Sequence, residues 1–265
     1  MLLTSWRVFR NGLLRAFAYR TTIGFWMLSR VTQFFLATSL WSAIFASTAA
    51  PTIGGYDRAG MIAYYLLAFT VLATAMSYNE YTIAPQIRSG SIAAYLTRPF
   101  DYALMKSIES ISWHVLQGVI AVAIFWICGR LVGVPFGTGL RLYELPAFLL
   151  SIVFAVVISN AISVLMASLT FWTPETNAFF DTKGVLFFIL GGAALPLSIL
   201  PGAFRTVVER SFLPTIVAIP LWIADGTHGA AAPLLAQQAA WTLVFLLLAA
   251  YAWRRGIRRF ESVGG

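Results

Sequence analysis

The sequence predicts an all-α polytopic membrane protein with six transmembrane helices. Of its 265 residues, 59% are hydrophobic and only 11% are charged, and the mean hydropathy is +0.80. Soluble domains are typically about 45–50% apolar and about 25% charged. Six mostly apolar runs follow one another, and most reach the roughly 20 residues that a helix needs to cross a bilayer.

We expect one transmembrane domain over residues 1–265. It divides into an N-terminal helix at 1–21, a six-span bundle at 22–253 and a basic tail at 254–265. The first apolar run exceeds the 7–15 apolar residues of a signal peptide, so we expect it to be retained. The spans are predicted at 22–48, 59–80, 107–130, 145–171, 184–200 and 232–253.

The N-terminal helix is predicted to be amphipathic. Trp6, Phe9 and Leu13 share one face, while Arg7 and Arg15 lie roughly opposite. This pattern is typical of a helix lying in the headgroup region of a membrane. A plain cytosolic extension of the first span is the alternative.

Basic residues set the predicted orientation. Both ends of the chain are basic, with Arg7, Arg10, Arg15 and Arg20 before the first span and Arg254, Arg255, Arg258 and Arg259 after the last. Cytoplasmic edges of membrane proteins carry such an excess of Lys and Arg. We therefore expect both termini and the loop at 81–106 to be cytoplasmic.

The segment after the fifth span is broken by prolines. The apolar run at 212–224 is too short to span comfortably, and as a seventh span it would place the C-terminal arginines outside. We expect it to dip into the membrane from outside, which requires surrounding protein or a water-filled cavity. The pairs Gly191-Gly192 and Pro201-Gly202 mark close backbone approach or a closed passage.

One charge lies inside a predicted span. Arg30 is about nine residues into the first apolar run, where a charge costs about 3 kcal/mol unless it pairs or reaches the interface. The span could begin later, so that Arg30 reaches the interface, or Arg30 could pair with Glu80 or Asp181. For Asp181 and Lys183 we expect solvated positions at a helix end.

The sequence lacks the residues that several functional classes require. The phosphate-binding motif Gly-x-x-x-x-Gly-Lys-Ser/Thr is missing, so no nucleotide hydrolysis by that mechanism is expected. One cysteine and two histidines supply metal chemistry poorly. The net charge of +8 lies beside apolar runs rather than in a nucleic-acid-binding patch. We predict no catalytic, metal or cofactor site in this chain and no nucleic-acid partner.

Short motifs in a fixed order carry a family resemblance. They are Ala-Tyr-Arg (18–20), Gly-Gly-Tyr (54–56), Tyr-Tyr (64–65), Ile-Arg-Ser-Gly-Ser-Ile (87–92), Tyr-Leu-Thr-Arg-Pro (95–99), Pro-Leu-Ser-Ile-Leu-Pro-Gly (196–202), Phe-Leu-Pro (212–214) and a basic C-terminal run. Together they resemble permease subunits of type-2 ABC transporters, the exporter class with six spans. The resemblance covers essentially the whole chain.

The resemblance implies two functional segments. The loop between spans two and three would form a coupling helix that docks on an ATPase, with Ile87, Arg88, Ser89, Gly90, Tyr95, Leu96, Arg98 and Pro99. Ala94 would join Ile87 and Tyr95 or Leu96 in an apolar groove of that ATPase. A glutamate ahead of the coupling helix would correspond to Glu80. Short re-entrant helices on the outer side would form a gate with Gly191, Gly192, Pro196, Pro201, Gly202 and Pro214.

The implied partners are ABC ATPase subunits, which would bind ATP and Mg, a second permease subunit and membrane lipid. The implied location is the bacterial cytoplasmic membrane. A stand-alone secondary transporter or channel is the alternative, and a membrane-embedded enzyme is the third. The sequence leaves the transported substrate and the direction of transport open.

Overall fold

The computed structural model describes residues 2–18, 20–97 and 99–260. In this part of the chain 78% of the residues are helical and strands are absent. An isolated bridge joins Ile53 to Tyr56. The prediction of an all-α protein is confirmed.

Helices and short 3-10 segments make up the regular structure of the described residues. The α-helices are α1 (Leu2–Ala18), α2 (Arg20–Ser47), α3 (Arg58–Ala75), α4 (Glu80–Arg88), α5 (Ala93–Leu96), α6 (Tyr102–Val132), α7 (Leu145–Ser168), α8 (Asn177–Leu190), α9 (Gly202–Arg210), α10 (Ala218–Asp225) and α11 (Ala231–Arg259). Short 3-10 segments are η1 (Leu142–Glu144), η2 (Leu169–Phe171), η3 (Leu197–Ile199) and η4 (Leu213–Thr215).

Four helical stretches are long and apolar enough to cross a membrane, counted over the described residues. They are Arg58–Arg88, Tyr102–Val132, Leu142–Phe171 and Ala231–Arg259. The chain is therefore an integral membrane protein. The count of six spans stays a prediction, since it also needs α2 and the shorter α8.

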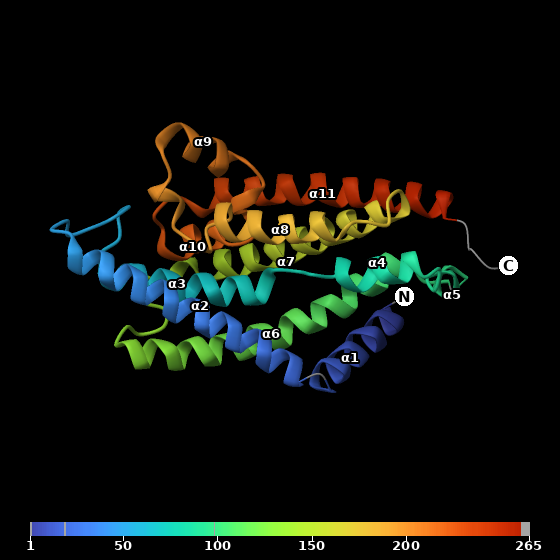
Figure 1. The fold of residues 1–265 in the computed structure, drawn as a ribbon, viewed down its shortest axis with the longest axis horizontal. Helices are drawn as coiled ribbons and strands as arrows, with labels where there is room; N and C mark the ends of the chain where they lie inside the picture. The colour runs from blue at the N-terminus through green and yellow to red at the C-terminus, as the bar shows by residue number, and fades with distance from the viewer. Residues whose placement is uncertain (1, 19, 98, 261–265) are drawn as a thin grey trace.

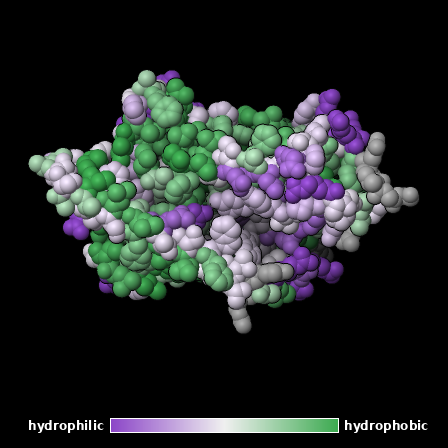
Figure 2. All heavy atoms as spheres, in the orientation of Figure 1, coloured by the Kyte–Doolittle hydropathy of each residue, from purple (hydrophilic) through white to green (hydrophobic). Residues whose placement is uncertain are grey.

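Long helices run along the molecule and place the loops at its two ends. Figure 1 shows α5, the start of α1 and the end of α11 in one half, and α9, α10 and the loop after α2 in the other. Figure 2 shows hydrophilic residues gathered towards the half that holds α5, and hydrophobic residues over much of the opposite half. The two ends of the molecule thus differ in chemistry.

The helix α3 lies at the centre, and its most apolar stretch is 78% buried. It packs against α2, α6, α7 and α10. Phe69 of α3 stacks on Phe125 of α6, which meets Phe34 of α2 edge to face. A helix that is apolar all round is typical of a protein core or of a membrane span, and α3 is enclosed by its neighbouring helices.

The predicted end of the fifth span is wrong. The fifth span was expected at 184–200, but α8 ends at Leu190, because Gly192 turns the chain with φ +96° and Pro196 follows. The basic segment predicted from 254 onward continues α11 to Arg259, since neither Gly256 nor the arginines around it break the helix. Residues 261–265 lie outside the described part.

The N-terminal helix packs along α6. Ser112 Oγ donates a hydrogen bond to the Phe9 carbonyl at 2.9 Å, and Arg15 pairs with Glu109 at 2.8 Å. A β-carbon on Gly12 would lie 2.7 Å from Ser112 Oγ, so the two helices need a glycine there. Trp6 on the same helix is 60% exposed.

Candidate functional site

The helix that enters the core as α3 breaks before it continues as α4. The backbone turns extended at Met76, with ψ 117°, and helix resumes at Glu80. Inside a bilayer the freed backbone groups need partners from the protein, because hydrocarbon supplies none. Ser77 N donates to Ser159 Oγ at 2.7 Å, and Ser77 O accepts from Lys183 Nζ at 2.7 Å. Side chains of α7 and α8 therefore hold the break in place.

A buried ion pair lies directly after this break. Lys183 Nζ is 2.5 Å from Glu80 Oε1, and the two side chains are 4% and 0% exposed. The ammonium also contacts Ser163 Oγ at 3.2 Å and lies 5.2 Å from the centre of the Tyr78 ring. Removing one partner from a buried pair typically costs about 3–5 kcal/mol, because the other charge stays uncompensated. The pair fixes α4 to α8.

Polar side chains extend this contact towards α6. Ser77 Oγ lies 3.4 Å from both Ser110 Oγ and Asn160 Oδ1. His114 Nε2 lies 3.2 Å from Ser110 Oγ and 3.2 Å from Asn160 Nδ2. A connected polar network therefore joins the break before α4 to α6, α7 and α8 inside an otherwise apolar bundle.

The predicted partners of Arg30 are engaged elsewhere. Glu80 pairs with Lys183, and Asp181 accepts a hydrogen bond from the Tyr81 hydroxyl. Arg30 instead contacts two neutral oxygens, Gln33 Oε1 at 3.2 Å and the Tyr78 hydroxyl at 3.5 Å. The pairing of Arg30 with either acid is therefore wrong for this structure.

The expectation of a solvated Lys183 is also wrong. Helix α8 begins at Asn177, so Lys183 lies in its second turn rather than before the span. There it faces α4 and is 5% exposed. The lysine, its serine partners and Asn160 were missed because their pairing depends on how distant helices meet.

The segment expected to couple to an ATPase is a turn between α4 and α5. Gly90 has φ +73°, the left-handed conformation that glycine adopts most easily. Ser89, Ser91, Ala94, Thr97 and Pro99 are exposed around this turn, whereas Tyr95 and Leu96 are half-buried. Arg98 lies outside the described residues.

Two residues of this segment make contacts within the chain, but only one of them is buried. Ile87 is 5% exposed and belongs to the hydrophobic core, so it is unavailable for a groove on another subunit. Arg88 donates to the Pro174 carbonyl at 2.9 Å. The expected role of Ile87 is corrected accordingly, since Ile87 anchors the end of α4. Arg88 ties α4 to the loop before α8 but is exposed, so its contact with a partner stays a prediction.

Aromatic contacts connect the same turn to the ends of two long helices. Tyr95 meets Tyr102 edge to face at 5.3 Å, and Tyr102 stacks on Trp253 at 5.7 Å. The Tyr102 hydroxyl donates to Gln86 Oε1 at 2.5 Å. The turn is therefore rigidly connected to α6 and α11.

The segment after α8 is a series of short helical pieces buried in the protein. Ala218 N donates to the Gly191 carbonyl at 3.0 Å, and the Tyr64 hydroxyl donates to the Gly192 carbonyl. Pro196 and Pro201 precede η3 and α9, and Pro214 is buried in η4. All residues of α10 from Ala218 to Ala224 are buried.

The glycines of this segment differ in how much room they have. A β-carbon on Gly191 would collide with the Phe187 carbonyl, and one on Gly192 would lie 2.9 Å from the Ala218 β-carbon. Gly202 is exposed, and a β-carbon there would meet no heavy atom within 4 Å. A bulky residue at Gly202 therefore has space, so the close backbone approach predicted for Pro201-Gly202 is absent at this glycine.

Ionisable residues cluster at the end of the molecule that holds α10. Asp225 Oδ1 accepts from Thr227 N at 2.9 Å, and the Tyr56 hydroxyl lies 3.4 Å from Asp225 Oδ2. Burial raises the pKa of the Asp225 carboxyl and that of the Tyr56 hydroxyl. His228 stacks on Trp222 at 3.9 Å, and burial lowers its pKa despite the carboxylate of Glu209 at 3.5 Å.

Metal ligands do not gather anywhere among the described residues: no group of three or more His, Cys, Asp or Glu side chains could hold an ion there.

Comparison with known families gives a direct match. Residues 29–264 match the family described as ABC-2 family transporter protein. A search of the curated proteins found no match.

Proposed function

The chain belongs to the ABC-2 transporter family, and we propose that it is the transmembrane subunit of an ATP-driven exporter. In this proposal α2 and α8 complete six spans together with the four long apolar stretches. ATP and Mg would be bound by separate ATPase subunits, since no phosphate-binding motif is present in this sequence.

The distribution of charge supports an orientation with both termini in the cytoplasm of a bacterial cell. The start of α1, the turn at α5 and the end of α11 lie in the same half of the molecule. The arginines of α11 (Arg254, Arg255, Arg258 and Arg259) lie at that end. A cytoplasmic edge is where such an excess of arginine is expected.

The observation that carries the proposal is the buried Glu80–Lys183 pair. Movement imposed on the turn at α5 would pass into α4, which begins at Glu80. Because Glu80 is held by Lys183, α8 would move with α4. The far end of α8 carries Gly191, whose carbonyl is bonded to Ala218 of α10. Docking of an ATPase at one end would thereby reach the segment at the other end.

We propose that this far segment, from Gly191 to Asp225, is a re-entrant outer gate. Non-spanning backbone at membrane depth is tolerated where protein surrounds it, and the burial of α10 meets this requirement. The hydrogen bond from the Tyr64 hydroxyl to the Gly192 carbonyl fixes the gate to the central helix α3. Gly191 and Gly192 are the sites where side chains would interfere with closure.

A second permease subunit would complete the pathway. Helix α8 leaves Phe179, Val185, Leu186 and Ile189 exposed, with exposed fractions of 52%, 56%, 41% and 42%. It contacts few other elements, mainly α4 and η4. An apolar helix face with this little cover is suited to packing against an identical or sister subunit.

A stand-alone ion-coupled transporter is the second candidate function. The observation that favours it is the polar network around Glu80, Lys183 and His114, because ionisable residues inside a membrane often serve ion pathways. Co-purification distinguishes the two functions. A tagged chain expressed with its neighbouring genes should retain an ATPase subunit, and export from vesicles should require ATP. Export that continues without ATP and collapses with the proton gradient would favour the second candidate.

A further inference from the structure

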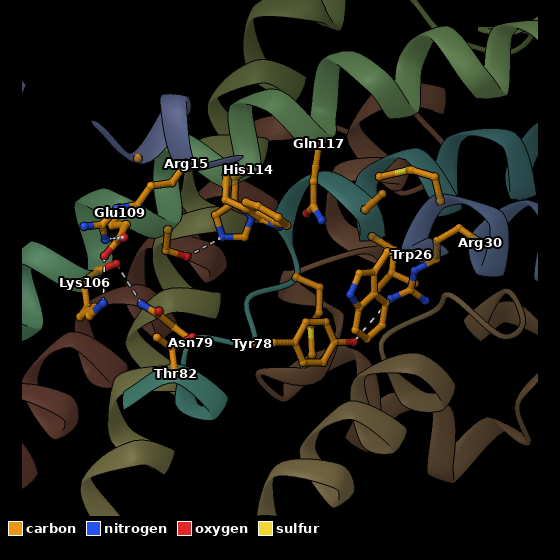
Figure 3. A pocket seen from close by; sticks show the side chains of 17 residues that line it. Arg15, Trp26, Arg30, Tyr78, Asn79, Thr82, Lys106, Glu109, His114 and Gln117 are labelled. Atoms are coloured by element: carbon orange, nitrogen blue, oxygen red, sulfur yellow. Dashed lines mark hydrogen bonds and ion pairs between the residues drawn. The ribbon is translucent and has the colours of Figure 1, made fainter. Parts of the chain in front are cut away.

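A cleft of roughly 630 Å³ opens between the N-terminal helix and the bundle. Its walls come from α1, α2, α3, the break before α4, and α6. Figure 3 shows Trp26, Arg30 and Tyr78 on one side of this cleft and Arg15, Lys106 and Glu109 on the other. It lies apart from the re-entrant segment and from the turn at α5.

The charges that line the cleft do not balance. Glu109 is 2.8 Å from Arg15 and 2.9 Å from Lys106, so one carboxylate serves two cations. Arg30 adds a third positive charge and has no acid within ion-pair distance among the described residues. Its guanidinium offers five N–H donors and uses them for two long contacts with neutral oxygens. The cleft therefore attracts an anion.

Part of the remaining lining is aromatic or apolar, and part is polar, with Asn79, Thr82, Ser110, His114 and Gln117. Trp26 is 49% exposed, and its ring stacks on Tyr78 with 6.0 Å between ring centres. Met27 and Leu72 also line the cleft but are only 3% and 2% exposed. On other faces of α2, Phe25 and Leu28 are 73% and 60% exposed. A ligand with a negative head and hydrocarbon chains fits this combination better than a free inorganic anion.

We propose that the cleft binds an anionic phospholipid of the cytoplasmic leaflet, with its phosphate on Arg30 and its acyl chains along the exposed face of α2. Arginine suits this role, because its planar guanidinium forms two parallel hydrogen bonds to a phosphate. The choice of leaflet takes the orientation from the proposed function, but binding itself requires only that the chain lie in a membrane. Lipid bound here would join the N-terminal helix to the bundle and give Arg30 the partner it lacks within the chain.

Lipid binding is measured on the delipidated full-length protein in detergent, without ATPase subunits. Native mass spectrometry compares phosphatidylglycerol with phosphatidylcholine of the same chains. Wild type should prefer phosphatidylglycerol. Arg30→Gln should lower the affinity for that lipid by about tenfold or more, since a charge-assisted bond contributes about 1.5–3 kcal/mol. Arg30→Lys should bind with intermediate affinity. The matched control is Arg130→Gln, which removes another arginine beside a tryptophan, Trp126 at 5.1 Å, and should bind like wild type.

Four results would overturn the proposal. The first is equal binding of the two lipids by wild type. The second is undiminished phosphatidylglycerol binding by Arg30→Gln and, should that variant fail to fold, by Trp26→Leu. The third is displacement of the lipid by millimolar inorganic phosphate, which would indicate a site for a free anion. Release of the lipid only during ATP turnover of the whole complex would identify it as cargo and likewise contradict a resident lipid. Because binding is measured without ATP, its failure leaves the proposed export function untouched.

Discussion

Lys183 of α8 and Glu80 of α4 form an ion pair at 2.5 Å from which solvent is almost excluded. The lysine also donates to the Ser77 carbonyl at the break between α3 and α4. One side chain therefore neutralises a buried carboxylate and satisfies a backbone group that the broken helix leaves free. This double role makes the pair the connection between the two ends of the molecule.

Removing either member of the pair should destabilise the protein strongly. Lys183→Met and Glu80→Gln should each lower the free energy of unfolding by about 3–5 kcal/mol, because a buried charge loses its partner. The free energy of unfolding should fall less in the double variant than the sum of the two single decreases, since no unpaired charge remains. Thermal unfolding in detergent measures this. The control is Arg205→Gln, which breaks the i,i+4 pair with Glu209 on α9 and should cost about 1 kcal/mol or less.

The double variant also tests the transmission of movement. If the pair transmits movement from α4 to α8, the double variant should assemble with its ATPase and hydrolyse ATP without exporting substrate. Full export by a well-folded double variant would contradict this role, whatever its thermal stability.

Docking at α5 predicts a variant that folds but does not couple. Ala94 is exposed on α5, so Ala94→Arg should leave thermal stability unchanged while bulk and charge block an apolar partner surface. Pull-down of the ATPase and ATP hydrolysis by the complex should both fall severalfold. Ala50→Arg, at an exposed alanine in the loop after α2 at the opposite end, should match wild type in both assays. Normal ATPase capture by Ala94→Arg would exclude α5 as the docking element.

Ile87 and Ala94 should respond differently, although the sequence suggested the same role for both. Ile87 is part of the core, so Ile87→Ala should lower the free energy of unfolding by about 2–5 kcal/mol. Once stabilised by lower temperature, this variant should still capture the ATPase. Loss of capture by folded Ile87→Ala would restore a docking role for Ile87.

The glycines of the outer segment should divide according to the space around them. Gly191→Ala should destabilise the protein and reduce export, because its β-carbon would collide with the Phe187 carbonyl. Gly202→Ala should change the free energy of unfolding by about 0.5 kcal/mol or less, because the site is open and exposed. Unfolding temperature and export are compared for both variants. Equal effects of the two substitutions would contradict an outer gate that closes at Gly191.

Composition and spacing were sufficient to predict the class of the protein and most of its helices. Apolar runs define spans because a bilayer has a fixed thickness, and Gly90 marked a turn that glycine favours. The break at Met76 was not predicted, since Ser77 and Tyr78 carry no helix-breaking signal. The partner of Glu80 was also missed. Lys183 is 103 residues away in the chain, and only the packing of α4 against α8 brings the two together.

Acidification should destabilise the outer end of the molecule through His228. Burial lowers the pKa of this imidazole below its ordinary value of 6.5, so the unfolded chain binds the proton more readily than the folded one. Stability should therefore be complete above about pH 6.5 and fall as the pH drops towards the lowered pKa. Unfolding temperature is measured between pH 7.5 and pH 5.5 for wild type and for His228→Gln, which stays neutral. The facing groups (Glu209, Arg205 and Asp225) remain in both proteins, so their titration cancels to first order. We expect a smaller loss of unfolding temperature in His228→Gln; an equal loss in both proteins would assign the pH dependence to other groups.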